Sequence, residues 1–147
     1  MEQLFEFMFG ASGRINRARY WKSLLILGVA GLLVSVVLLT AAGLATPLLI
    51  VAVVIFFLPW LMWGLAIHSE RLHDRNKSAW WLVVFYLVPG LLGHLANLSL
   101  LDGAAGLALS YALAMVASAL AIWGFVEIAC LRGTTGSNRY GANPPAH

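Results

Sequence analysis

Four long apolar runs dominate this sequence, and they leave little room for a fold outside a membrane. The runs cover approximately residues 23–44, 48–67, 80–101 and 106–131. A run of about 20 apolar residues can cross a hydrocarbon core of roughly 30 Å as a helix. Only 10% of the 147 residues are charged, against about 25% in a soluble domain. The sequence therefore predicts an all-α integral membrane protein, a single domain that folds as a four-helix bundle.

The positive charges of this chain all lie outside the apolar runs. The nine Lys and Arg side chains fall into three clusters, which precede the first run, occupy a loop at residues 68–79 and follow the fourth run. Four membrane crossings place these three segments on one face, and the positive-inside rule assigns a face rich in Lys and Arg to the cytoplasm. We therefore predict that the 68–79 loop and both termini are cytoplasmic.

The N-terminal residues 1–11 carry apolar side chains at helical spacing, with Glu2, Gln3 and Glu6 at the remaining positions. This pattern predicts a short amphipathic helix that lies in the membrane interface; a frayed terminus is the alternative. No cleaved signal peptide is expected, because the first apolar run is longer than the apolar core of a signal peptide, about 7–15 residues.

Two prolines and a series of small residues predict how the spans bend and pack. Pro59 lies in the second span and Pro89 in the third, where a proline removes one backbone hydrogen bond and kinks a helix. In the fourth span, small side chains recur every four residues, at Gly106, Ser110, Ala114 and Ser118. Such a series lets a second helix approach closely.

His73 and Asp74 are the pair that most resembles a catalytic site, because a carboxylate can orient a histidine for acid–base chemistry. Adjacent residues of a helix point about 100° apart, however, so adjacency in sequence is poor evidence for a hydrogen-bonded dyad. We expect instead that Asp74 pairs with an arginine, and we assign no catalytic residue. His68 and His73 are five residues apart, not the four that place two histidines on one helical face, so we expect no metal site and no cofactor.

Two ionisable side chains lie within the predicted spans, His94 in the third and Glu127 in the fourth. An ionisable group inside a membrane is a functional hypothesis by default, but a neutral His94 that is hydrogen-bonded within the bundle is the simpler interpretation. Glu127 lies near the inner end of its helix, at a different depth from His94. We expect Glu127 to meet an arginine of the cytoplasmic face, from residues 14–19, Arg71 or Arg132.

The sequence contains no phosphate-binding loop, dinucleotide-binding fingerprint, HExxH motif or serine-nucleophile elbow. Its basic groups are few, and the membrane topology already explains them. We therefore expect no nucleic-acid partner.

Three segments of the chain resemble a known family. They are SGRINRARYW at 12–21, ERLHDRNKSAWW at 70–81 and GSNRYGANP at 136–144. They are similar to the bacterial inner-membrane family catalogued as domain of unknown function 805, which shows a Gly-Arg…Arg…Tyr-Trp entry, an Arg-Leu-His-Asp loop ending in Trp and an Asn-Arg-Tyr-Gly…Pro tail. The resemblance implies a small multi-span protein of the bacterial cytoplasmic (inner) membrane, and it brings no established activity. Where the family often has a second arginine before Arg71, this chain has Glu70.

The three segments all belong to the face predicted to be cytoplasmic, and we expect them to form one composite surface there. Its polar network would contain Arg14, Arg17, Arg71, His73, Asp74 and Arg139. An aromatic collar would pack against this network, formed by Trp21, Trp80, Trp81 and Tyr140.

The sequence supports three hypotheses about function. The first is a non-enzymatic accessory or scaffold protein whose cytoplasmic face binds anionic phospholipid headgroups or a partner protein. The second is a subunit of an oligomeric channel or transporter, with His94 near the pathway; four spans enclose little room, so several copies would be needed. The third is a membrane enzyme that uses His73 and Asp74. The expected partners are the lipid bilayer, further copies of this chain or another membrane protein.

Overall fold

The computed structural model describes residues 13–98 and 103–144. Within these ranges the chain is built of helices, and the only β-type pairing there is an isolated bridge between Asn138 and Gly141. The predicted all-helical class, with four helical segments, is confirmed. The interfacial helix expected at residues 1–11 lies outside the described ranges.

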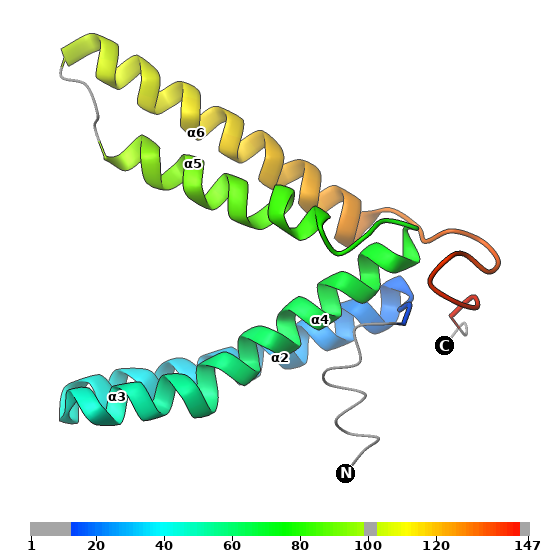
Figure 1. The fold of residues 1–147 in the computed structure, drawn as a ribbon, viewed down its shortest axis with the longest axis horizontal. Helices are drawn as coiled ribbons and strands as arrows, with labels where there is room; N and C mark the ends of the chain where they lie inside the picture. Colours follow the sequence, from blue (N-terminus) through cyan, green and yellow to red (C-terminus); the bar gives the residue numbers. More distant parts are fainter. Residues whose placement is uncertain (1–12, 99–102, 145–147) are drawn as a thin grey trace.

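The helices form two antiparallel hairpins (Figure 1). In the first hairpin, α2 (Arg17–Leu44) lies against a continuous helix composed of α3 (Thr46–Ala52), η1 (Val53–Phe57) and α4 (Leu58–Asp74). In the second, η2 (Val83–Leu87) and α5 (Val88–Asn97) lie against α6 (Gly103–Phe125) and η3 (Val126–Cys130). Each element labelled η is one π-helical stretch.

Three of the helices are long and apolar enough to cross a membrane, namely Arg17–Leu44, Thr46–Asp74 and Gly103–Cys130. The fourth helix, Val83–Asn97, is shorter. Its 5-residue η2 and 10-residue α5 extend about 22 Å at a rise of 1.5 Å per residue. The predicted third span, 80–101, ends among residues that the structure does not describe.

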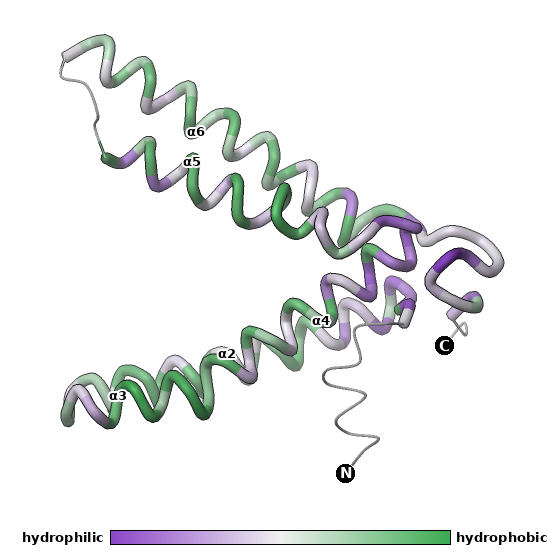
Figure 2. Tube along the Cα trace, in the orientation of Figure 1, coloured by the Kyte–Doolittle hydropathy of each residue, from purple (hydrophilic) through white to green (hydrophobic). Residues whose placement is uncertain are grey.

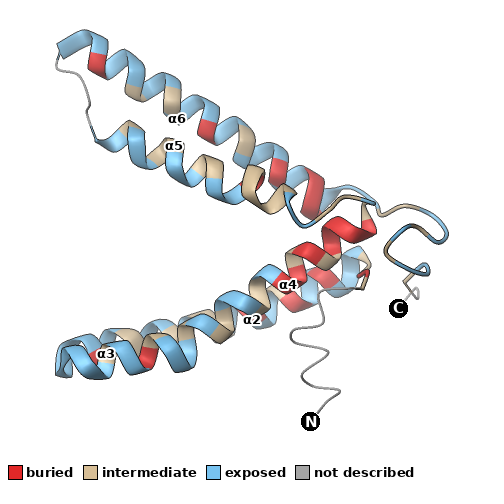
Figure 3. Ribbon diagram, in the orientation of Figure 1, coloured by how far each residue is buried: buried red, intermediate tan, exposed pale blue. Residues whose placement is uncertain are grey.

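The two hairpins converge at one end and splay apart toward the other (Figure 1). Among the described helices, η3 is the only element of the second hairpin whose Cα atoms approach those of the first within 8 Å, and it does so at α2 and α4. Hydrophilic residues gather at this converging end (Figure 2), and so do most buried residues (Figure 3). The fold is therefore closed at its polar end, while the apolar helix faces beyond it remain exposed.

The charged segment at 68–79 is mostly helical, which corrects the loop predicted there. α4 continues through Asp74, and Asn76, with a φ of 58°, makes the turn that follows. The added helix is stabilised by tertiary contacts, because its last turns carry the buried side chains of Arg71 and Leu72. Burial of these side chains favours the helix beyond the point where the apolar run ends.

Pro59 and Pro89 do not break their helices. Each follows a π-helical turn, in which the N–H of Leu58 donates to the Val53 carbonyl and that of Val88 to the Val83 carbonyl. The wider turn accommodates a proline ring that would clash, in a regular α-helix, with the carbonyl four residues earlier. Both turns open with Val-Val, and the proline follows six residues after the first valine.

Small residues of α6 face the other helix of the second hairpin. Ser110, Ala114 and Ser118 of α6 line a groove together with Gly93 of α5. Nearer the converging end, a Cβ atom added at Gly124 would lie 2.7 Å from Cβ of Phe85. Gly124 therefore lets η2 lie directly on α6, as small residues do where membrane helices meet.

Candidate functional site

Asp74 is the centre of a buried ion-pair network at the converging end. Its Oδ1 accepts hydrogen bonds from Nε and Nη2 of Arg14, at 3.2 and 3.1 Å, and its Oδ2 accepts from Nη1 of Arg71. The exposed fractions of the Asp74, Arg14 and Arg71 side chains are 4%, 1% and 0%. Arg71 lies one turn before Asp74 on α4, whereas Arg14 precedes α2, which Asn16 caps by accepting from the Arg19 N–H.

Arg14 also binds the segment that follows η3. Its Nη2 donates to the carbonyl oxygen of Thr134 at 2.7 Å, and its Nη1 donates to those of Gly136 at 2.7 Å and Gly141 at 3.1 Å. All three acceptors are backbone groups more than 100 residues further along the chain. One side chain thus ties the C-terminal segment to the N-terminal one.

Arg71 completes the connection between the hairpins. Its Nε donates to the Ile128 carbonyl at 2.9 Å, and its Nη2 donates to the Leu131 carbonyl. Its Nη1 also reaches the Ile15 carbonyl at 3.3 Å. The carbonyls at the end of η3 lack partners within their own helix, as helix ends do, and this guanidinium supplies donors for them.

Arg14, Arg71, Asp74 and the segment 133–141 together form what we term the polar clasp. It holds two guanidinium charges and one carboxylate charge away from water, and the backbone carbonyls satisfy the remaining donors. Removal of one partner from such a buried network costs about 3–5 kcal/mol, because it leaves an uncompensated charge. Loss of one member of the polar clasp should therefore lower the free energy of unfolding of the whole protein.

Gly133 lets the C-terminal segment lie directly on Asp74. A Cβ atom added at Gly133 would lie 1.9 Å from Oδ2 of Asp74. The next residue, Thr134, donates its N–H to the Asp74 carbonyl at 2.8 Å and its hydroxyl to the same oxygen at 3.0 Å. No side chain other than hydrogen fits at position 133 without displacing the carboxylate.

His73 and Asp74 are not hydrogen-bonded to one another. The His73 ring is buried and stacks on Tyr140, with ring centroids 3.9 Å apart and an interplanar angle of 7°. Burial lowers the pKa of His73 and favours the neutral ring. Asp74 is occupied by Arg14 and Arg71, so the geometry is that of ion pairing and not of a His–Asp dyad.

The two other arginines of the predicted network lie at its exposed rim. Arg17 donates from Nη1 to the Cys130 carbonyl at 3.1 Å. Arg139 donates to the Asn76 carbonyl at 3.1 Å, and its guanidinium lies 4.7 Å from the Tyr140 ring centroid. Neither residue contacts Asp74.

Glu127 pairs with partners other than those predicted. Its Oε1 lies 2.9 Å from Nη2 of Arg75 and 3.4 Å from Nζ of Lys77. The expected partners, at residues 14–19, Arg71 or Arg132, form no ion pair with Glu127 in the described chain. The reason is the extra helix at the end of α4, which brings Arg75 against η3.

The four predicted aromatic residues do not form one collar. Trp21 packs edge-on against Tyr20 and Phe125, between the hairpins. Trp81 packs against Trp123 beneath Lys77, and Tyr140 covers His73. Trp80 is 79% exposed, because it lies in the turn before η2.

His94 is exposed on α5 and makes no hydrogen bond to a described residue, which corrects the expected bond within the bundle. Small residues of α5 such as Gly93 face α6, and the adjacent position points about 100° away from that contact. His94 is absent from the residues that line the groove between the two helices.

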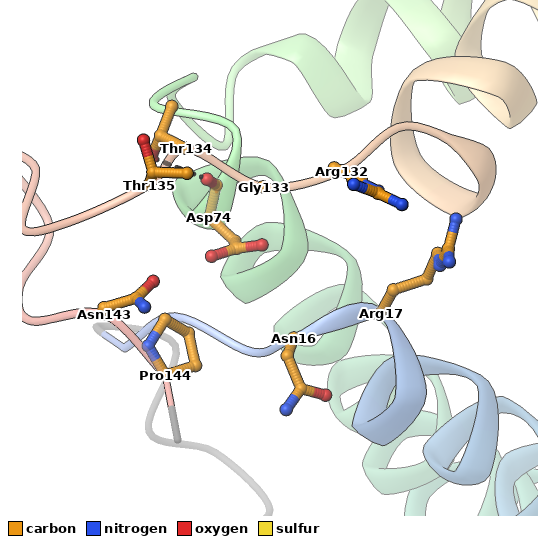
Figure 4. Close-up of a pocket in the computed structure, with 9 residues that line it drawn as sticks. All are labelled: Asn16, Arg17, Asp74, Arg132, Gly133, Thr134, Thr135, Asn143 and Pro144. Atoms are coloured by element: carbon orange, nitrogen blue, oxygen red, sulfur yellow. Dashed lines mark hydrogen bonds between the residues drawn. The ribbon is translucent and has the colours of Figure 1, made fainter. Parts of the chain in front are cut away.

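A pocket of about 270 Å³ lies beside the polar clasp (Figure 4). Its wall is formed by Asn16, Arg17, Asp74, Arg132, Gly133, Thr134, Thr135, Asn143 and Pro144. It lies where the start of α2, the end of α4 and the C-terminal segment meet. It therefore adjoins all three segments that carry the sequence motifs.

Residues 8–142, which include this whole site except its last two lining positions, match the family described as "Protein of unknown function (DUF805)". The chain belongs to this family. It is 32% identical over 135 residues to the inner membrane protein YhaI of Escherichia coli K12, and 30% identical over 139 residues to the inner membrane protein YhaH of the same strain. Both alignments cover 92% of this chain, with 86% and 87% of the relatives. No solved structure matches it significantly.

This DUF805 protein is accordingly a multi-pass protein of the bacterial inner membrane. Within residues 13–98 and 103–144, no group of three or more His, Cys, Asp or Glu side chains is arranged to hold a metal ion. Apart from the Asp74 carboxylate, which is paired with Arg14 and Arg71, the polar side chains of the site supply arginine donors, hydroxyl groups and amides, which are suited to binding an anion.

Sequence reasoning about this DUF805 protein missed Gly133, Thr134 and Asn138. Asn138 donates to the His73 carbonyl at 2.9 Å and to the Thr134 hydroxyl at 2.9 Å. The available signal was the run of glycine, threonine and asparagine after the fourth span, which is typical of a structured turn. Many contacts of this segment involve backbone carbonyl groups. The pattern of charged residues in the sequence therefore could not predict them.

Proposed function

We propose that this protein is a non-enzymatic membrane protein whose polar end faces the cytoplasm and binds the phosphate group of an anionic lipid. The observation that carries the proposal is the pocket that Arg17 and Arg132 line together. Its lining offers two guanidinium groups, side-chain hydroxyls and amides at one place. Arginine is well suited to such a site, because its planar fork matches the oxygens of a phosphate.

The two guanidinium groups have donors to spare. Both residues are exposed. Arg17 uses one N–H on Cys130, and its Nε and Nη2 make no hydrogen bond to a described residue. The Arg132 side chain makes none either, although its carbonyl accepts from Arg75 at 2.5 Å. In Figure 4 the two guanidinium groups lie toward one end of the pocket, with Asn143 and Pro144 toward the other.

The carboxylate in the pocket wall does not oppose an anion there. Asp74 carries one negative charge, but Arg14 and Arg71 are both paired with it. With Arg17 and Arg132, four guanidinium charges surround one carboxylate charge. The electrostatic potential at the pocket is therefore positive, and it is supported by groups that the polar clasp holds in place.

The position of the pocket supports a lipid as the source of the phosphate. Arg17 is the first residue of α2, and Arg132 is the second residue after η3. Arg17 therefore lies at the end of a helix that can cross the membrane and Arg132 just beyond the end of another, which places both near the level of lipid headgroups. The concentration of Lys and Arg at this end favours the cytoplasmic side, where anionic lipids attract basic groups with about 1 kcal/mol each.

The other two hypotheses draw less support from the geometry. An enzyme that uses His73 and Asp74 needs a contact between these side chains, and each of them is engaged elsewhere. A pathway that uses His94 needs that residue to line a cavity, and His94 lies outside the groove between α5 and α6.

The test is retention of lipid by the protein after it is extracted gently from bilayers of phosphatidylglycerol and phosphatidylcholine, measured by native mass spectrometry. We expect phosphatidylglycerol to be retained in preference. The double variant R17Q/R132Q should lower its affinity about thirtyfold, which corresponds to about 2 kcal/mol for two basic groups. The matched control is K22Q/R139Q, which removes the same charge from exposed positions outside the pocket.

If both double variants lose lipid equally, the effect comes from net charge, and the assignment of this pocket as the lipid-binding site is overturned. Equal retention of phosphatidylcholine by the wild type would overturn the anion preference. A co-purifying protein that is lost only in R17Q/R132Q would assign the pocket to a protein partner instead.

A further inference from the structure

A second pocket, of about 290 Å³, lies between the two hairpins on the membrane side of the polar clasp. Its lining residues come from α2, α4 and η2, and they are Leu27, Trp60, Leu61, Gly64, Leu65, His68 and Tyr86. Apart from His68, these residues lie within the predicted apolar spans, and His68 follows the second span by one residue. The pocket therefore opens at the level of the bilayer, near its polar boundary.

One imidazole nitrogen of this pocket is an unused acceptor. Nδ1 of His68 lies 2.6 Å from the carbonyl oxygen of Gly64. A carbonyl oxygen only accepts hydrogen bonds, so the neutral ring carries its proton on Nδ1 and leaves the Nε2 lone pair available. Nε2 makes no hydrogen bond to any residue that the structure describes.

Two tyrosine rings hold this histidine in place. His68 packs edge-on between Tyr20 and Tyr86, with ring centroids 5.7 and 5.2 Å away and interplanar angles of 89° in both cases. The hydroxyl of Tyr86 also makes no hydrogen bond to a described residue. The pocket is thus lined by two neighbouring polar side chains, which supply an acceptor nitrogen and a hydroxyl.

The opposite wall is apolar and preformed. The Trp60 indole donates its N–H to the Leu27 carbonyl at 2.9 Å, which leaves no free donor on that side chain. Its ring lies across Gly31 of α2, where a Cβ atom would approach it to 3.1 Å. The absence of a side chain at Gly31 fixes Trp60 against α2 and keeps this wall in position.

We propose that this pocket binds the hydroxyl head of an uncharged long-chain lipid alcohol. The hydroxyl donates to Nε2 of His68 and its oxygen accepts a hydrogen bond from the Tyr86 hydroxyl, while the hydrocarbon chain lies against Trp60 and the leucines. Polar groups at membrane depth need partners, and such an alcohol supplies one. No Lys, Arg, Asp or Glu lines the pocket, so a phosphorylated or zwitterionic head has no counter-charge there. Two neighbouring polar side chains match a single hydroxyl better than the two opposed oxygens of a quinol.

The test compares geranylgeraniol with its methyl ether, which keeps the chain and loses the hydroxyl proton. Binding to the full chain in detergent is measured by native mass spectrometry titration. We expect the alcohol to bind about three- to tenfold more tightly than the ether, the range for one neutral hydrogen bond. The variant H68F should reduce this ratio toward one while it leaves the affinity for the ether unchanged. The variant Y86F removes a donor that both ligands can use, so it should weaken the binding of both about equally and keep the ratio.

Y111F is the matched control, because Tyr111 lies on α6 outside this pocket; it should keep the wild-type ratio. R17Q/R132Q should keep it too, which separates this proposal from the anionic-lipid pocket. The assignment is overturned by a wild-type ratio of one, by a ratio insensitive to H68F, by affinities for both ligands that are insensitive to Y86F, by no detectable binding, or by tighter binding of menaquinol or diacylglycerol than of geranylgeraniol.

Discussion

Nη2 of Arg14 lies 3.1 Å from Oδ1 of Asp74, although the two residues are 60 positions apart in the sequence. Both side chains are almost fully removed from water. The pair joins the segment before the first helix to the end of the second helix, and the C-terminal segment closes over it. Stability of the whole fold should therefore respond sharply to changes at these positions.

Replacement of Asp74 by alanine should lower the free energy of unfolding by about 3–5 kcal/mol, because Arg14 and Arg71 would remain buried without a counter-charge. Thermal unfolding of the detergent-solubilised protein measures this effect. The control is R139A at the exposed rim, which should change stability by about 0.5 kcal/mol or less. Similar losses in the two variants would contradict a buried network.

Replacement of Gly133 by alanine should destabilise the protein severely, since the new methyl carbon would lie 1.9 Å from Oδ2 of Asp74. The expected result is faster proteolysis of the C-terminal segment together with a lower unfolding temperature. The matched control is G28A on α2, where a Cβ atom meets nothing within 4 Å. A G133A protein as resistant to protease as G28A would show that the segment does not pack on Asp74.

The pairing of Glu127 with Arg75 can be measured by a double-mutant cycle with E127Q and R75Q. Glu127 is buried while Arg75 is about a quarter exposed, so we expect a coupling free energy of about 1 kcal/mol. Lys77 remains as a second partner of Glu127, which limits the cost of R75Q alone. A coupling of zero, with a large coupling to R132Q instead, would contradict the observed pairing.

Glu70 should make stability depend on pH. It lies beyond the apolar span at 48–67, and burial raises its pKa from 4.5 to about 7, although Arg19 opposes the shift. Since the folded-state pKa is the higher one, the native protein binds the proton more tightly than the unfolded chain does. The stabilisation that protonated Glu70 provides is present below about pH 4.5, and it is lost as the pH rises to about 7.

The measurement is the unfolding temperature of the wild type and of E70Q across this pH range. Glutamine resembles the protonated side chain, so E70Q should lose less stability as the pH rises. The difference between the two curves isolates the contribution of Glu70 from that of every other group. Parallel curves would show that Glu70 is fully solvated in the native state.

Much of the fold is predictable from hydropathy, because each apolar run is long enough to require a helix in a membrane. The meeting of Arg14, Arg71 and Asp74 is also partly predictable. Once the apolar runs are assigned as spans, the three charged segments must lie at the same end. Arg71 and Asp74 are three residues apart, a spacing that puts them on one face of a helix.

The remaining features depend on tertiary contacts that the sequence does not display. The helical extension through Asp74 exists because Arg71 and Leu72 are buried against other elements, and it changes the partner of Glu127. The close packing within the second hairpin depends on which residues meet, as Gly124 of α6 and Phe85 of η2 do. The role of Gly133 depends on the position of a carboxylate 59 residues earlier in the chain.

The backbone acceptors of Arg14 impose an order on biosynthesis. The donor is made early, yet its carbonyl partners at Gly136 and Gly141 lie 122 and 127 residues later. Both hairpins must therefore be inserted into the bilayer before this arginine is fully satisfied. A nascent chain that has not yet emerged as far as residue 136 therefore leaves the Nη1 donors of Arg14 without these two carbonyl partners.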